Sequence, residues 1–233
     1  MRRCLMILSL CLPLPAHALE EAAFDISLRG IKGAQLAWRA QESAGGYAVS
    51  AAIRTTGAVG LLARFTFDGL AQGRGGAADP RPIRFEERVR TPEREGFTVL
   101  TYTGGTPTIA EREPPRDASP WDIDPAAQTG RIDPVTGTWL MLRDVAVDAA
   151  CVLDMRVYDG RRATRVVLSD PQPSEGGVTC AGTYIRQDGF PPDEMAERTD
   201  FPFTLSYDAV GDRLQVRELR LSTPYGDAVL SRR

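Results

Sequence analysis

Four aspartates precede an apolar run in the middle of the chain, and carboxylates at this spacing suit three kinds of chemistry. They are Asp117, Asp122, Asp124 and Asp133, and the apolar run is TWLML at 138–142. The carboxylates could bind calcium, form a hydrolytic pair, or cap short helices. An EF-hand calcium loop needs a glycine and a further oxygen ligand where this chain has Pro125 and two alanines, so we expect no bound metal. A hydrolytic pair needs carboxylates roughly 5 to 10 Å apart, and the sequence singles out no such pair.

Helix capping accounts best for Asp133. An aspartate directly before a proline places a side-chain acceptor ahead of a residue whose φ is already helical. We therefore predict that Asp133 caps a short helix from Pro134 to Leu142, with Trp139 in its apolar stripe. The segment FPPDEMAER at 190–198 predicts a second helix of one or two turns. We expect both helices to cover an end of a curled sheet.

The histidine and cysteine content excludes several classes of enzyme. The chain has one histidine, His17, which lies in an expected signal segment, so the mature protein has none. Ser-His-Asp and Cys-His nucleophile sites and histidine-ligated zinc or iron all need an imidazole. We therefore expect a protein that is not an enzyme and that carries no cofactor.

The first 18 residues are typical of a secretory signal peptide. Arg2 and Arg3 precede the apolar run CLMILSLCLPLP, and AHA at 16–18 is a small-x-small cleavage site. The apolar run is shorter than the roughly 20 residues that span a bilayer. We predict cleavage near Ala18, a periplasmic location, and one β-rich domain over 19–233 that does not span the membrane.

Removal of the signal leaves a mildly acidic chain with two cysteines. It retains 26 basic residues, which is 28 less Arg2 and Arg3, against 31 acidic ones, a net charge of −5 that disfavours nucleic acid as a partner. In an oxidising periplasm Cys151 and Cys180 are expected to form a disulfide. A loop of this length would stabilise the fold by roughly 3 to 4 kcal/mol. In a flat meander, however, a third strand would hold the two cysteines about 9 to 10 Å apart, beyond disulfide reach.

Alternation of apolar and polar residues at period two predicts the fold class. It recurs with turn residues between the segments, for example at Phe24, Ile26 and Leu28 and at Phe201, Phe203, Leu205 and Tyr207. Asp159-Gly160 predicts a type I′ hairpin turn. A switch of apolar parity between Val216 and Leu219 predicts a bulge. We expect an all-β protein with a single large curled antiparallel sheet, an open barrel or β-spiral of about 12 strands, and one or two short helices.

One apolar segment breaks the strand pattern. TTGAVGLLARF at 55–65 places Val59, Leu61 and Leu62 in a glycine-punctuated loop. Such a loop could plug the core, or could contact a partner or a ligand together with Trp139. We expect these residues and the helix that carries Trp139 to lie at the same end of the sheet and to close its interior.

Several motifs resemble a known family. They are FDISLRGIKGAQL, TTGAVGLL, IDPVTGTWLML, CVLDMRVYDGRR, TCAGTYIR and YGDAVLSRR. Together they are similar to the exported proteobacterial domain-of-unknown-function family numbered 3108, over nearly the whole mature chain. The resemblance implies a periplasmic β-rich protein and no catalytic residue.

Three functions are compatible with this sequence. The favoured hypothesis is a non-enzymatic cell-envelope factor that binds a protein or a cell-wall component, and it requires an exposed apolar loop or sheet edge. The alternative is a periplasmic lipid or lipoprotein carrier, which requires a continuous apolar cavity. A carboxylate-based hydrolase is the third, and it requires two facing carboxylates in a cleft. We favour the first because other periplasmic proteins with curled sheets serve the cell envelope, and this argument rests on analogy of fold and not on chemistry.

Overall fold

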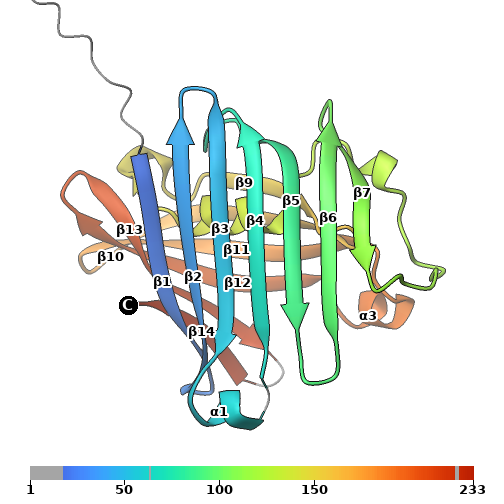
Figure 1. Cartoon of the computed structure of the whole chain (residues 1–233). Coiled ribbons are helices and arrows are strands. Elements are labelled where there is room, and N and C mark those ends of the chain that lie inside the picture. The colour runs from blue at the N-terminus through green and yellow to red at the C-terminus, as the bar shows by residue number, and fades with distance from the viewer. Residues whose placement is uncertain (1–17, 63, 224–225) are drawn as a thin grey trace, which may run out of the picture.

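A computed structural model describes residues 18–62, 64–223 and 226–233 of the protein. The predicted signal peptide lies outside these residues except for Ala18, so its cleavage stays a prediction. The described chain forms a sheet of fourteen strands, against about twelve expected, with three short α-helices (Figure 1). None of the described helices has the length and apolar character needed to cross a bilayer.

The N-terminal half of the sheet is a meander of seven strands. These are β1 (Ala18–Leu28), β2 (Ile31–Ser43), β3 (Gly46–Thr55), β4 (Thr66–Arg74), β5 (Arg81–Arg90), β6 (Glu95–Thr103) and β7 (Thr106–Glu113). Helix α1 (Gly57–Leu62) follows β3. The 3₁₀ turn η1 (Pro125–Gln128) and helix α2 (Pro134–Leu142) follow β7.

The C-terminal half is a second meander that runs back to the first. It contains β8 (Val145–Ala146), β9 (Leu153–Tyr158), β10 (Ala163–Ser174), β11 (Gly177–Asp188), β12 (Asp200–Val210), β13 (Arg213–Thr223) and β14 (Gly226–Arg232), with η2 (Val147–Ala149) and α3 (Pro192–Glu197) between strands. Strand β14 pairs with β1, so the order runs β7 to β1 and then β14 to β9, with β8 beside β13.

Period-two alternation accounts for these strands, as the sequence predicts. Along β2 the side chains of Leu36, Trp38 and Ala40 are buried while those of Ala37 and Arg39 are exposed. The predicted bulge in β13 is confirmed, because Ser206 pairs with Glu218 and Tyr207 pairs with Val216, which leaves one residue of β13 extra. The type I′ prediction is wrong. Residues 159–162 form a four-residue loop, and only Gly160 of the two turn residues has a positive φ.

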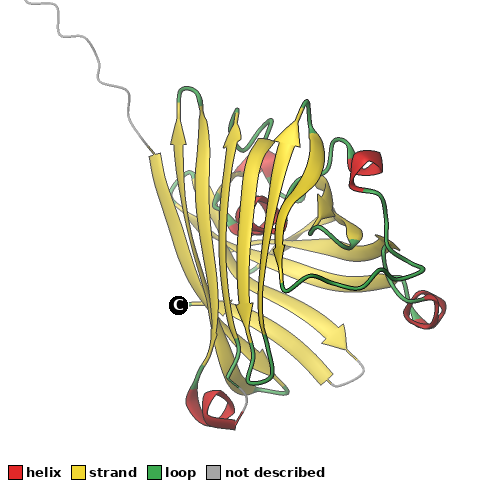
Figure 2. Cartoon of the chain, turned by 45° about the vertical axis from the view of Figure 1, so that its right-hand side comes forward, coloured by secondary structure: helices red, strands yellow, loops and turns green. Residues whose placement is uncertain are grey.

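The two halves of the sheet face each other across a filled core. Figures 1 and 2 show the N-terminal strands in front, the C-terminal strands crossing behind them, and α2 between the two. Fully buried side chains come from both halves and from the helix, among them Phe24, Phe85, Trp139, Tyr158 and Leu205. The interior of the curled sheet is therefore packed with side chains.

Helix α2 lies inside the sheet, which corrects the expectation that it covers an end. Val135 contacts β4 at Gly69, where an added Cβ would lie 2.4 Å from Val135 Cγ2. On the opposite side, Gly137 lies against Met155 and Val157 of β9. The helix thus joins the two halves, and small residues allow its close approach.

The segment that leads into α2 also covers the two outer strands of the sheet. The N–H of Gly130 donates to the Gly105 carbonyl, next to β7, at 3.0 Å. The N–H of Ile132 donates to the Arg156 carbonyl of β9, and the N–H of Tyr158 donates to the Ile132 carbonyl, both at 2.9 Å. The sheet is not closed by strand pairing, and this segment bridges its edges.

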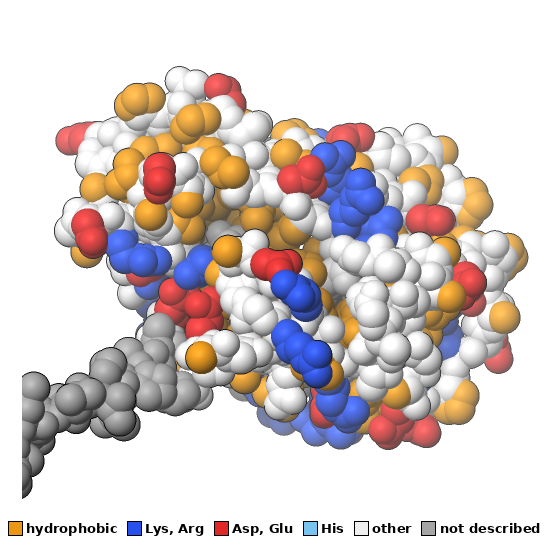
Figure 3. Space-filling view, turned by 90° about the horizontal axis from the view of Figure 1, so that it is seen from above, with side chains coloured by type: hydrophobic (Ala, Val, Ile, Leu, Met, Phe, Trp, Pro, Cys, Tyr) orange, Lys and Arg blue, Asp and Glu red, His pale blue; other side chains and the backbone are white. Residues whose placement is uncertain are grey.

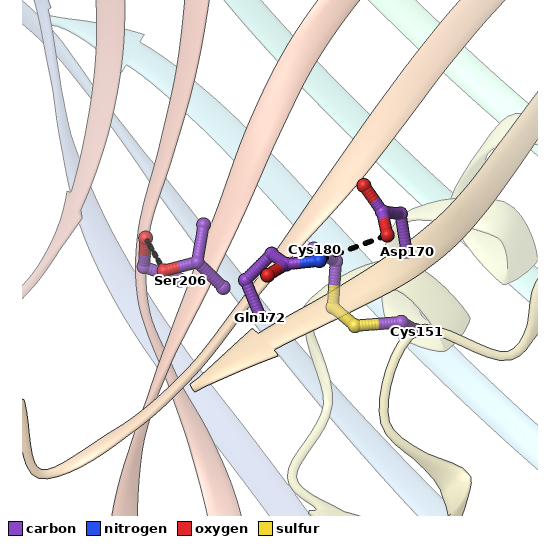
Figure 4. The surroundings of a disulfide bond; sticks show 6 residues. Cys151, Asp170, Gln172, Cys180 and Ser206 are labelled. Carbon is purple, nitrogen blue, oxygen red and sulfur yellow. Dashed lines mark hydrogen bonds between the residues drawn. A yellow bond between two sulfur atoms is a disulfide. The ribbon is translucent and has the colours of Figure 1, made fainter. Parts of the chain in front are cut away.

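The predicted disulfide is confirmed, and its geometry removes the distance conflict. Cys151 and Cys180 are bonded with Cα atoms 5.3 Å apart, and both side chains are buried (Figure 4). Strand β9 starts only at Leu153, so Cys151 has left the sheet. Between Ser169 and Gln172, β10 bulges opposite Cys180. The cysteine before β9 can therefore reach β11 past β10.

We expect that loss of the disulfide destabilises the protein without changing its fold. In the Cys151→Ser, Cys180→Ser double variant, a loop of 29 residues' separation is no longer closed in the unfolded chain, so the free energy of unfolding should fall by about 3 to 4 kcal/mol. Urea denaturation of both proteins measures this. A difference below about 1 kcal/mol would contradict the loop-closure argument.

Gly69→Ala should destabilise the protein by about 1 to 3 kcal/mol, because the new methyl group would overlap Val135 and push α2 away from β4. The matched control is Gly96→Ala on β6, where the nearest atom to an added Cβ is 3.9 Å away. Thermal unfolding of both variants tests the packing. Equal melting temperatures for the two would refute close contact between α2 and β4.

Candidate functional site

The residues predicted to contact a partner or ligand do not lie together. Val59 lies on α1, half-buried against Gly33 of β2. Leu61 and Leu62 lie on the same helix, but their side chains are outside the described part of the structure. Figure 1 shows α1 below the lower end of the N-terminal strands, whereas Trp139 is fully buried on the central helix. Trp139 is thus a core residue, and the expectation of a common end is wrong.

Trp139 instead belongs to a polar anchor at the C-terminal end of α2. Its indole N–H donates to Glu20 of β1 at 3.0 Å, and the Arg143 guanidinium donates to the same carboxylate at 3.0 Å. Arg143 also lies 5.4 Å from the centre of the Trp139 ring. Burial raises the pKa of Glu20, but the hydrogen bonds from Arg143 and Trp139 outweigh it and hold the pKa below its usual value. Glu20 therefore joins β1 to α2 as a carboxylate.

Asp133 caps the other end of α2, as predicted. Its carboxylate accepts the Thr136 N–H at 2.8 Å and the Thr136 hydroxyl at 2.6 Å. Because the Thr136 hydroxyl gives its only proton to Asp133, the Tyr47 hydroxyl of β3 donates to Thr136, at 3.2 Å. Asp133 is fully buried, and burial raises its pKa to about 6 despite these hydrogen bonds.

Two other aspartates of the acidic segment bond its own backbone, while Asp117 is exposed. Asp124 accepts the Ala126 N–H at 2.9 Å and caps η1. Asp122 accepts the Ser119 N–H at 2.7 Å and pairs with Arg116. Over the described residues, no three acidic, cysteine or histidine side chains converge on a point that could hold a metal ion.

Sequence reasoning missed a carboxylate neighbourhood beneath the β9–β10 hairpin. Burial, and then the nearby Asp159, raise the pKa of Glu87 on β5 to about 7, against a hydrogen bond from Thr98 and the charge of Arg112. Asp159 accepts the N–H groups of Arg161 and Arg162, at 2.8 and 2.6 Å. Asp159 thus stabilises its own turn through these hydrogen bonds. We therefore interpret the closeness of Glu87 and Asp159 as a result of packing between the hairpin and the sheet. No pattern in the sequence relates residues 87 and 159.

One surface cleft lies on the outer face of the N-terminal half. It encloses about 720 Å³ over small side chains such as Ala37 and Ala52. Its two carboxylates, Glu21 and Asp68, are paired with Arg39 and Arg54. The floor is a continuous ladder of paired strands, so this cleft offers a shallow surface.

A second cleft, which we call the β9 groove, lies at the upper end of the molecule between the β4–β5 loop, α2 and β9. It encloses about 730 Å³. Its apolar lining includes Pro80, Ile132, Leu140, Val145, Leu153 and Met155. Arg143, Asp154 and Arg156 add charge, and Val152 at its side is 75% exposed. Figure 3 looks down on this end and shows hydrophobic side chains in a hollow with basic ones beside it. The groove thus combines apolar side chains with charged ones, as surfaces that contact other proteins do.

Comparisons with known proteins agree with the fold and leave the activity open. The family model DUF3108, a protein of unknown function, matches residues 23–175. No curated protein matches the sequence. Among solved structures, a beta-barrel-like protein of the domain of unknown function DUF1849 from Brucella abortus is similar, with 12% identity and a TM-score of 0.50. That match covers 92% of this chain and 95% of the other. At this identity the likeness concerns the fold alone.

The buried cap gives a specific pH dependence. The folded-state pKa of Asp133, about 6, lies above its ordinary value of 3.8, so the folded protein holds this proton more tightly than the unfolded chain. The contribution of Asp133 to the free energy of unfolding is therefore fully present below pH 3.8, and it is lost as the pH rises to about 6. An asparagine at this position would cap equally well without titrating. The unfolding free energy of the wild type minus that of Asp133→Asn should fall by roughly 2 to 3 kcal/mol between pH 4 and pH 6.5.

Asp133→Ala is the control for capping itself. It leaves the buried Thr136 N–H and hydroxyl without their acceptor, so it should be about 1 to 3 kcal/mol less stable than Asp133→Asn at every pH. Urea denaturation across this pH range measures both effects. A difference between wild type and Asp133→Asn that does not vary with pH would show that Asp133 stays ionised in the core.

Proposed function

The chain belongs to the DUF3108 family of proteins of unknown function, and we propose that it is an exported, non-enzymatic protein of the cell envelope that binds another protein in the β9 groove. The observation that carries this proposal is the groove itself, a cleft with apolar and charged side chains beside an outer strand of the sheet. Val152, which lines the groove, is 75% exposed, and Val147, which lies in the chain between the lining residues Val145 and Ala149, is 62% exposed. Exposed apolar side chains around a cleft are typical of protein contact sites.

The other features of the chain support this choice. The buried disulfide suits an oxidising compartment outside the cytoplasm. The carboxylates in the two larger clefts are held by arginines, as in the Asp154–Arg165 pair, which disfavours proton transfer to a substrate. The packed core between the sheet halves disfavours a lipid carried inside the sheet.

A matched pair of substitutions tests the role in the envelope. Val152→Asp and Val210→Asp both place a charge at an exposed valine, and only Val152 lines the groove. Neither should change the melting temperature, because neither side chain is buried. We expect that cells without the gene are sensitive to detergent, that Val210→Asp restores their resistance, and that Val152→Asp does not. Deletion cells as resistant as their parent would refute the envelope role.

Photocrosslinking identifies the class of partner. A benzoylphenylalanine at position 152 should give a protein adduct in intact cells, and one at position 210 should not. An adduct with lipid at position 152 would replace the proposed function with the carrier hypothesis. Adducts of equal yield at both positions, or none at position 152, would show that the groove is not the binding site.

A further inference from the structure

The outer edge of β9 is only partly covered. Strand β9 pairs with β10 on one side, and alternation along the strand directs the backbone groups of Asp154, Arg156 and Tyr158 to the other side. The Arg156 carbonyl and the Tyr158 N–H are bonded to Ile132. Within the described residues, the N–H and carbonyl of Asp154 and the N–H of Arg156 have no hydrogen-bond partner. Two donors and one acceptor therefore face outward next to the groove.

Such an edge is a template for another strand. Unpaired N–H and carbonyl groups in a row accept an extended polypeptide, and its backbone supplies the hydrogen bonds. The covering bridge at Ile132 prevents pairing beyond Arg156, and Cys151 leaves the strand direction with a φ of 60°. The available length is the short stretch from Val152 to Arg156.

The groove provides the contacts that a strand at this edge needs. Side chains of an extended segment alternate between its two faces, so every second residue of an added strand would point toward the groove. Leu140, Leu153 and Pro80 line the groove and offer an apolar surface to those residues. An acyl chain could use the apolar wall but has no groups that bond the Asp154 and Arg156 backbone. This favours a polypeptide over a lipid.

The charges beside the edge favour an acidic segment. The Arg156 side chain is exposed and makes no ion pair among the described residues. Asp154 is neutralised by Arg165, whose Nε donates to it at 2.7 Å. Burial, and then Arg156 nearby, lower the pKa of Arg131. A carboxylate on the partner would compensate the unpaired positive charge.

Resting on the proposed function, we propose that the partner is an extended acidic polypeptide segment that adds to the edge of β9 as a further strand over Val152–Arg156. Its backbone bonds Asp154 and Arg156, alternate apolar side chains enter the β9 groove, and a carboxylate pairs with the Arg156 guanidinium. The contact is short, so binding by the segment alone is weak, with a Kd of the order of micromolar.

Two substitutions at one position test this mode of binding. Asp154→Pro removes an outward N–H and places a ring at the edge, while the bonds to β10, which residues 153, 155 and 157 make, are kept. Asp154→Asn is the matched control, because it removes the ion pair with Arg165 and keeps the backbone donor. The probe is a dodecapeptide chosen from a random phage-displayed library on the purified wild-type protein.

We expect the enriched peptides to alternate apolar and polar residues and to contain a glutamate or aspartate. Asp154→Asn should bind the probe within about threefold of the wild type, and Asp154→Pro at least about tenfold more weakly. Arg156→Gln should weaken binding and reduce its dependence on salt. Equal binding by Asp154→Pro, or enrichment of basic peptides, would overturn the proposal.

Amide hydrogen exchange in the wild-type protein tests the proposal even if Asp154→Pro does not fold. The probe should slow amide exchange in the wild-type protein at Asp154 and Arg156 and leave the β12–β13 turn at Gly211 unchanged. Protection absent from Asp154 would overturn strand addition. So would a dimer of this chain, seen by sedimentation without peptide, that the substitution abolishes. A crosslink from position 152 that persists in Asp154→Pro would retain the proposed function and overturn the added strand alone.

Discussion

Packing of α2 between the halves of the sheet is the constraint on which the rest of the structure depends. A curled sheet of this length turns one apolar face inward, and that face must be covered to be stable. Helix α2 covers it from within, with Val135 against β4 and Gly137 against β9. Its two ends are held by polar contacts, at Asp133 and at Glu20. Position and orientation of the helix are thus fixed by hydrogen bonds, while burial supplies most of the stability.

The same helix determines where the surface stays open. The chain that leads into α2 crosses from β7 to β9 and bonds Gly105 and Arg156 on its way. It covers the part of the β9 edge beside Tyr158 and then turns inward at Asp133. The part between Val152 and Arg156 is left beside a cleft whose floor includes Leu140 of α2. The β9 groove is therefore a consequence of how the core is filled.

Local patterns in the sequence predict most local features, although not the turn at Asp159-Gly160. Period-two alternation identified the strands, the parity switch located the bulge at β13, and the Asp-Pro pair identified the start of α2. Apart from the disulfide, which the cysteine count indicates, contacts between distant residues lie beyond local patterns, since no pattern relates Glu20 to Trp139 or Glu87 to Asp159. The pairing of β1 with β14, which places α2 inside, is another of these contacts. The expectation that the helix of Trp139 lies at an end of the sheet is wrong for this reason, because the apolar stripe is the same for a helix inside a sheet and for one that covers its end.

The candidate site depends on such a long-range arrangement, and the disulfide is part of it. Cys151, directly before Val152, is bonded to Cys180 of β11 and fixes one end of the uncovered edge. At the other end, Ile132 forms hydrogen bonds with Arg156 and Tyr158. The open stretch of backbone is therefore held at both ends. A strand that binds there would not have to order this stretch of β9. Less conformational entropy is then lost on binding, so even a few backbone hydrogen bonds can contribute to affinity. In this structure the disulfide thus serves the edge as well as the stability of the fold, since it fixes the place where β9 begins.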